Sequence, residues 1–181
     1  FDIAHGQKVL QMFGRAYGKF EEQGSREQNS FVHHAISELA DGQHVICIRI
    51  ALFAEMLRSQ PWSKQALKQL GGAQGVAVAY LEENLGATSA PHHRVYSQAT
   101  QRVLGALLPA GNTEIKGPAK SHSELKAHAE LRDAQAYDEV LDILSNELRL
   151  ITPTDPVKCG EAERESSYQL THDYLVPVLR E

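Results

Sequence analysis

Apolar residues recur at the spacing of amphipathic helices over most of the chain, and this pattern predicts a mainly α fold. Ser25 and Ser63 stand where they can cap a helix, and Gln28 completes a capping box with Ser25. Residues 45–57 are apolar on nearly every side, which is typical of a helix inside a domain, although Val and Ile also suit a strand at its start. The predicted helices cover residues 4–20, 26–39, 45–57, 64–70, 76–85, 94–108, a short stretch around 125–129, and 134–147.

The last third of the chain has a different order of elements. After the helix 134–147, the pattern predicts a strand at Leu150-Ile151, a polar and charged loop over residues 153–166, and a return strand at 168–170. Three helices followed by a strand, a long loop and a strand is the order of a winged helix, in which that loop is the wing. We expect Leu150 and Leu170 to face inward from a two-stranded β-hairpin.

Residues 87–93 predict a linker, because Pro91 lies there between two helical patterns. The expected architecture is therefore a helical bundle over residues 1–88 followed by a winged-helix domain over residues 89–181. The chain does not begin with Met and ends inside an apparent helix, so we interpret it as a piece of a longer protein.

A histidine-aspartate pair, His172-Asp173, lies where the last predicted strand runs into a short helix with Pro177 near its start. A helix start offers free backbone N–H groups and a partial positive charge. A histidine held there can meet an anion such as a phosphate. We expect Asp173 to order the junction by accepting N–H groups of the helix.

This junction resembles the end of the winged-helix domain in STAND-type signalling ATPases, the class that contains the NACHT and NB-ARC switches. Those proteins carry a His-Asp pair at this strand-to-helix step, and Thr171 stands here where they often have Met or Val. Further segments follow the order seen in bacterial members, so that the resemblance covers roughly residues 43–180. These segments are residues 50–57, 61–62, 70–76 and 148–153.

The resemblance implies a regulatory module that follows a nucleotide-binding core and gates it. His172 would then contact the terminal phosphate of the nucleotide in the longer protein, and Arg49, which interrupts an apolar helix, could also reach a phosphate. An arginine in such a place more often pairs with an acid at the rim of the fold. Family members meet adenine through a proline-containing stretch of the first helical domain, and residues 46–52 depart from this because they contain no proline.

Cofactors and partners follow from the same resemblance. We expect no cofactor in this chain but ADP or ATP with Mg²⁺ in the longer protein, which would be a P-loop ATPase. The expected partners are the upstream core and downstream repeat or effector domains. Residues 71–75 are glycine-rich but lack the lysine of a Walker A loop, and no Walker B run is evident, so the chain alone is not expected to be an enzyme.

A winged helix also suggests DNA binding, which is the alternative function. The helix 134–147 carries four acidic residues and neither Lys nor Arg, and the chain has a net charge of −5. Phosphates would repel such a surface, so we expect no nucleic-acid partner. A third reading is a protein-interaction scaffold without a nucleotide role.

Arg49 and Glu55 interrupt the longest apolar run, so we expect no membrane partner. Cys47 and Cys159 lie far apart and suggest no disulfide, which favours a reducing, cytoplasmic compartment. Cys47, in an apolar run, is expected to be buried.

No metal site is expected from the histidines. His33-His34 and His92-His93 are adjacent pairs, and neighbours in a helix point apart. His122 and His128 do not share a helical face, and no His-x-x-x-His or Cys-x-x-Cys spacing occurs.

Overall fold

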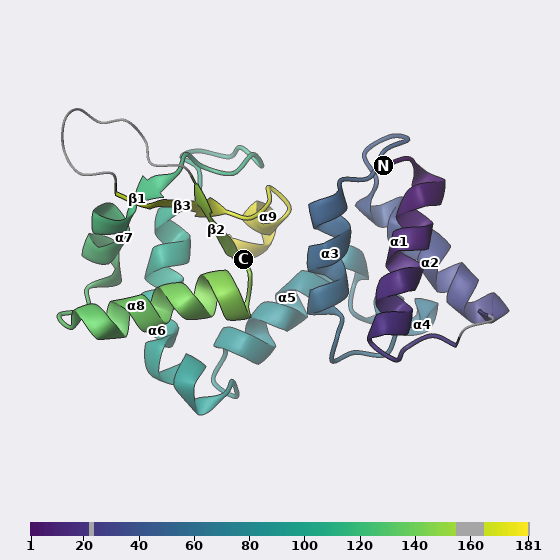
Figure 1. The fold of residues 1–181 in the computed structure, drawn as a ribbon, viewed down its shortest axis with the longest axis horizontal. Helices are drawn as coiled ribbons and strands as arrows, with labels where there is room; N and C mark the ends of the chain where they lie inside the picture. Colours follow the sequence, from purple (N-terminus) through teal and green to yellow (C-terminus); the bar gives the residue numbers. More distant parts are fainter. Residues whose placement is uncertain (22–23, 155–164, 181) are drawn as a thin grey trace. The chain divides into compact units, whose positions relative to one another are not determined.

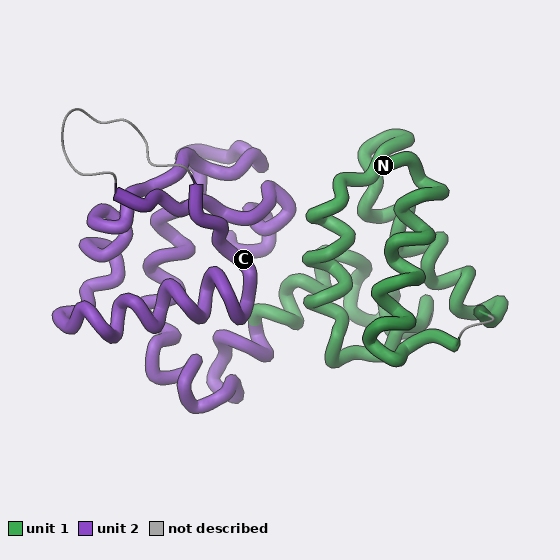
Figure 2. Tube along the Cα trace, viewed as in Figure 1, with its two compact units in different colours: residues 1–81 green, residues 82–181 purple. Residues whose placement is uncertain are grey.

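A computed structural model describes residues 1–21, 24–154 and 165–180. The chain divides into two compact units, unit 1 over residues 1–81 and unit 2 over residues 82–181 (Figure 2). The fold is mainly helical with a small antiparallel sheet, which confirms the predicted fold class (Figure 1). The predicted boundary between residues 88 and 89 stays a prediction; the compact units divide earlier, within a helix.

Unit 1 is a bundle of helices around an aromatic centre. Trp62 packs against Phe31 and Phe20, with ring centroids 5.7 and 5.4 Å apart, and its indole N–H donates to the carbonyl of Leu57 at 2.9 Å. Because the indole is both packed and hydrogen-bonded, it can be buried at no polar cost. The helices are α1 (Ile3–Ala16), α2 (Arg26–Leu39), α3 (Cys47–Met56), α4 (Lys64–Gln69) and α5 (Gly72–Leu85), the last of which runs into unit 2.

The predicted caps of unit 1 are confirmed. Ser25 forms the capping box with Gln28 at the start of α2, and the hydroxyl of Ser63 accepts the N–H of Ala66 at the start of α4. Between α4 and α5, Gly71 and Gly72 both have positive φ, a conformation that glycine adopts without strain. This turn is so short that α5 begins at Gly72, earlier than the predicted residue 76.

Helix α3 differs from the fully buried helix that the sequence predicts. Ile46 and Ile48 are 50% and 44% exposed, and Cys47 is exposed as well, against expectation. The exposure is confined to the start of the helix, because residues 50–57 are buried or half-buried on nearly every side, as predicted. This part of α3 packs against α1 and α2.

Unit 2 has the order helix, strand, helix, helix, strand, strand, which is the order of a winged helix. Its three-stranded sheet has the order β1-β3-β2, with Ile151 opposite Leu170 and Lys120 opposite Tyr168. The elements are α6 (Pro91–Ala106), β1 (Lys120–Ser121), α7 (His122–Ala129), α8 (Ala134–Asp142), the π-helical turn η1 (Ile143–Glu147), β2 (Ile151–Thr154), β3 (Ser167–Leu170) and α9 (Leu175–Leu179).

The predicted hairpin is confirmed, with Leu150 and Leu170 both fully buried. The sheet has three strands and not the predicted two, because β1 pairs with the other edge of β3. A strand of two polar residues has no alternation that could reveal it. Most of the predicted wing, residues 155–164, lies outside the described residues.

The predicted linker 87–93 is shorter than expected. Pro91 is the first residue of α6, where its missing N–H costs nothing and its fixed φ suits a helix. His92 and His93 therefore lie in the first turn of α6 rather than in a loop.

Gly75 is expected to tolerate no side chain. A Cβ at this position would collide with the backbone carbonyl of Leu70, which cannot move aside. We expect Gly75→Ala to lower the free energy of unfolding by roughly 1–3 kcal/mol, as overpacking does. Gly105→Ala is the control, because open space surrounds a Cβ there and the helix should gain roughly 0.5–1 kcal/mol. Urea unfolding followed by circular dichroism measures both; an unchanged Gly75→Ala variant would contradict the α4–α5 turn.

The capping box at the start of α7 makes a pH-dependent contribution. Glu124 accepts the backbone N–H of Ser121 at 2.8 Å, and this hydrogen bond lowers the pKa of Glu124. A depressed pKa in the folded state means that the stabilisation is complete above the unfolded pKa, roughly 4.3, and is lost as the pH falls through the folded value. The stability advantage of wild type over Glu124→Gln should therefore shrink on acidification. Thermal melts of both proteins across this range test it; a difference that is constant with pH would refute it.

Candidate functional site

The segment from β3 to α9 is held against the loop that precedes β1. Gln169 donates from Nε2 to the carbonyl of Gly117 at 2.9 Å. Arg180 donates from Nη2 to the carbonyls of Pro109 and Gly111, at 3.1 and 2.6 Å. Side chains at both ends of the segment therefore hold the strand-to-helix step in place.

His172 lies in this step and is only 7% exposed. Its Nδ1 accepts the backbone N–H of Tyr174 at 3.0 Å. An imidazole that accepts at Nδ1 carries its hydrogen on Nε2 when neutral, so Nε2 is the donor nitrogen of this ring. The ring thus satisfies one of the free N–H groups at the start of α9, which is a structural role for His172.

Asp173 has a different partner from the one predicted. Its Oδ1 accepts the backbone N–H of Lys116 at 2.8 Å, so this carboxylate binds the loop rather than the N–H groups of α9. The local reason is that the ring of His172 already accepts the N–H of Tyr174. Asp173 still orders the junction, but it does so by connecting it to the loop before β1.

Thr171 ties the junction to β2. Its N–H donates to the carbonyl of Leu150 at 2.9 Å, and its hydroxyl donates to the carbonyl of Arg149 at 2.8 Å. Arg149 has a positive φ of 54°, and this turn directs its carbonyl to Thr171. A hydroxyl therefore serves at the position where the resembling family often has Met or Val.

Arg49, the second residue expected to reach a phosphate, is half-buried in unit 1. Its Nη1 donates to the carbonyl of Leu39, the last residue of α2, at 3.0 Å. Carbonyls at a helix C-terminus lack intrahelical partners, and a cationic side chain also complements the partial negative charge there. This contact gives Arg49 a helix-capping role. Arg49 belongs to unit 1 and His172 to unit 2.

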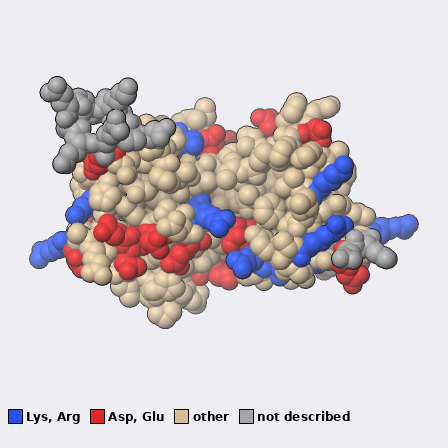
Figure 3. All heavy atoms as spheres, in the orientation of Figure 1, with Lys and Arg blue, Asp and Glu red and all other residues tan. Residues whose placement is uncertain are grey.

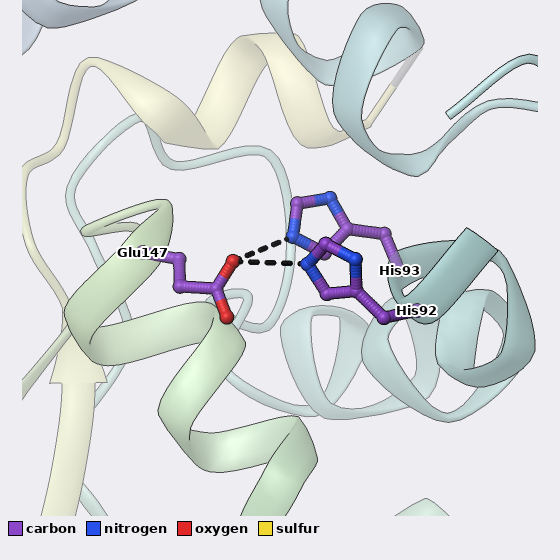
Figure 4. Close-up of side chains that lie close together, drawn as sticks. All are labelled: His92, His93 and Glu147. Carbon is purple, nitrogen blue, oxygen red and sulfur yellow. Dashed lines mark hydrogen bonds and ion pairs between the residues drawn. The ribbon is translucent and has the colours of Figure 1, made fainter. Parts of the chain in front are cut away.

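A cluster of three side chains, His92, His93 and Glu147, was not predicted from the sequence. Nε2 of His93 lies 2.9 Å and Nε2 of His92 lies 3.2 Å from the same oxygen, Oε2 of Glu147 (Figure 4). The two imidazole rings are in contact, with centroids 4.1 Å apart and planes inclined at 58° to each other. The two histidines come from the first turn of α6, and Glu147 is the last residue of η1.

The members of this cluster differ in exposure. The side chain of His93 is 7% exposed, whereas those of His92 and Glu147 are 57% and 42% exposed. Hydrogen bonds from His93 first, and then from His92, lower the pKa of Glu147, so that this carboxyl is ionised at neutral pH. The cluster is therefore anchored on a buried ring and open to solvent on its other side.

Two features of the structure hide this cluster from sequence reasoning. The sequence predicts a linker over residues 87–93, which contains both histidines, and neighbouring residues of a helix generally point apart. In the first turn of α6 both rings nonetheless reach one carboxylate oxygen. The partner lies 54 residues from His93 and on a π-helical turn, and neither fact leaves a signal in the sequence.

The exposed face of α8 is acidic. Acidic side chains gather over α8 in the space-filling view (Figure 3). Asp138, Glu139 and Asp142 are exposed, and Oδ1 of Asp138 lies 3.7 Å from Nε2 of His122. A helix surface of this charge would repel a phosphate backbone.

Unit 1 has a separate hollow of about 550 Å³ between α2 and α4. Its lining residues all have polar or charged side chains, and they include neither Arg49 nor any part of the glycine-rich residues 71–75. The lining residues are Glu27, Ser30, Ser63, Lys64, Gln65, Lys68 and Gln69.

Comparisons with known proteins give no family assignment. No family model matches this chain, and no curated protein or solved structure matches it. Within the described part of the chain, no helix has the length and apolar character needed to cross a bilayer.

The Asp173 contact should stabilise unit 2 measurably. Asp173→Ala leaves the half-buried N–H of Lys116 without its acceptor, which should cost about 1–3 kcal/mol in the free energy of unfolding. Asp173→Asn is the matched control, because an amide oxygen can still accept this hydrogen bond. Chemical denaturation of the three proteins measures the difference. Equal losses in both variants would show that the loop contact does not stabilise the junction.

Proposed function

We propose that this chain is a regulatory helical and winged-helix module of a STAND-like, ATP-dependent signalling switch. The observation that carries the proposal is the junction from β3 through His172 to α9, at the end of a unit with winged-helix element order. In this proposal the module holds the nucleotide-binding core of a longer protein in its closed state and releases it on a signal. The nucleotide is ADP or ATP with Mg²⁺, bound by that core.

The tautomer of His172 supports a donor role. With Nδ1 accepting from Tyr174, the neutral ring carries its hydrogen on Nε2, and an N–H of this kind can donate to a phosphate oxygen. Burial of the ring fixes its orientation, so that little rotamer freedom would be lost on contact. The contact favours the closed state only if the nucleotide touches the module better in that state than in the open one.

The surface chemistry favours protein partners over DNA. The exposed acids of α8 lie on the helix that follows α7, where a DNA-binding winged helix would need positive charge. The expected partners are accordingly the upstream core and downstream repeat or effector domains. The chain itself contains no Gly-Lys-Ser/Thr loop that could hold phosphates, so it gates rather than hydrolyses.

The test uses the longer protein with its core, loaded with ADP. His172→Asn is the informative variant, because an asparagine oxygen can still accept the N–H of Tyr174 while the Nε2–H donor is gone. A hydrogen bond to a charged group is worth roughly 1.5–3 kcal/mol, so ADP retention should fall about tenfold or more. The rate of ADP release, followed with a fluorescent analogue, measures this.

The control is Asp173→Asn, which changes the neighbouring side chain but keeps an acceptor for the Lys116 N–H. It should leave ADP release unchanged. Unaltered ADP release in a folded His172→Asn variant would refute the nucleotide role. Sequence-dependent duplex binding that weakens on changing α8 residues would instead favour the DNA-binding alternative.

A further inference from the structure

We propose that His92, His93 and Glu147 form a binding site for one divalent transition-metal ion of the zinc type. The inference does not depend on the proposed function. It rests on the positions of three ligand atoms, on the hydrogen-bonding requirements of His93, and on the partial burial of the cluster.

The ligand atoms are close to the geometry of a metal site. One atom from each of the three side chains can be chosen such that all lie within 4.8 Å of one another. Two ligands of a common tetrahedral zinc ion, each about 2.0–2.2 Å from it, are roughly 3.3 Å apart. The distances of 2.9 and 3.2 Å from the two Nε2 atoms to Oε2 of Glu147 need only a small expansion to admit an ion.

The hydrogen bonding of His93 leaves its Nε2 suited to bind a cation. Its Nδ1 lies 3.1 Å from the carbonyl of Asn84, and a carbonyl can only accept, so Nδ1 carries a hydrogen. Nε2 of the neutral ring then has a bare lone pair, 2.9 Å from a carboxylate oxygen that also only accepts. A metal ion between these two atoms can accept both lone pairs, whereas without one the hydrogen bond to Glu147 needs a hydrogen on Nε2 of His93 as well.

A metal ion can satisfy all three groups at once. His92 makes a second contact with the same oxygen, and its ring centroid is 4.1 Å from that of His93. One divalent ion bound by two neutral rings and a carboxylate would accept a lone pair from each of the three side chains.

The surroundings match those of metal ligands elsewhere. A ligating histidine usually donates its other ring N–H to a carbonyl or carboxylate, as His93 does to Asn84, which fixes the tautomer and the ring orientation. The exposed sides of His92 and Glu147 leave room for water as a fourth ligand and a path for entry. Glu147 is presented by a π-helical turn, a feature often found at functional sites.

The donor set selects the class of ion. Imidazole nitrogens with one carboxylate suit zinc and its transition-metal neighbours, whereas Mg²⁺ and Ca²⁺ prefer shells made of oxygen. A bound ion would join the start of α6 to the end of η1, two elements far apart in the sequence of unit 2. Binding should therefore stabilise unit 2 against unfolding.

The experiment titrates the 181-residue chain with Zn²⁺ by calorimetry and follows its melting temperature in parallel. We expect one Zn²⁺ per chain, a higher melting temperature with Zn²⁺, and no comparable effect of Mg²⁺. His92→Ala and Glu147→Gln change side chains that are 57% and 42% exposed. Each should weaken Zn²⁺ binding by about 100-fold or more, because even the outer-shell partners of ligands are worth 10–100-fold.

His34→Ala is the matched control. His34 lies 3.2 Å from Glu38, so it is also a histidine beside a carboxylate, but among the described residues this pair belongs to no group of three possible ligands. It should leave Zn²⁺ binding unchanged. The proposal fails if folded wild-type protein binds no Zn²⁺, if the control loses as much affinity as the cluster variants, or if NMR shows His93 as an imidazolium that Zn²⁺ does not displace.

Discussion

The pairing of β3 on both of its edges is the constraint on which unit 2 depends. β3 is the central strand of the sheet, with β1 on one side and β2 on the other, and Leu170 at its end is fully buried opposite Ile151. A slip of one residue would turn Leu170 to solvent and bring Gln169 into the core, so the register is strongly specified. Because the chain continues from Leu170 into the junction, this register also decides where His172 lies.

The junction inherits its rigidity from that strand. Thr171 continues the pairing with a hydrogen bond to Leu150, and Asp173 reaches the loop before β1. His172 is therefore held by backbone on both sides before any ligand is considered. This arrangement explains why a structural role and a nucleotide role are compatible in one ring: Nδ1 serves the fold, and Nε2 is the donor on which the proposed function relies.

Local signals explain most of what could be predicted from the sequence. The Ser25 capping box, the Ser63 cap and the inward-facing Leu150 and Leu170 depend on residues close in sequence or on a simple alternation, and the structure has all of them. Strand β1 consists of only two residues, both polar, and it forms because β3 lies beside it. Long-range pairing of this kind has no local pattern to read.

The candidate sites also combine features with a local sequence signal and features that depend on long-range contacts. The position of His172 at a strand-to-helix step was predictable, because the step itself has a pattern. The partners of Arg49 and Asp173 were not, since each binds a backbone group of another segment. The cluster at Glu147 depends on the early start of α6 at Pro91 and on the π-helical turn η1. The sequence predicts a regular α-helix to residue 147, and in such a helix the side chain of Glu147 would point in another direction.

The proposed metal site and the junction both lie in unit 2, but this does not mean that one controls the other. Glu147 lies three residues before Leu150, whose carbonyl accepts the N–H of Thr171, so a short path of covalent and hydrogen bonds joins the two. A path alone carries no coupling free energy. Coupling would need an element with two arrangements that both ligands bias, and the structure has one arrangement of η1. The proposed metal ion at Glu147 would, on this geometry, act as a fixed clamp on unit 2, and each of the two proposals can be right or wrong without the other.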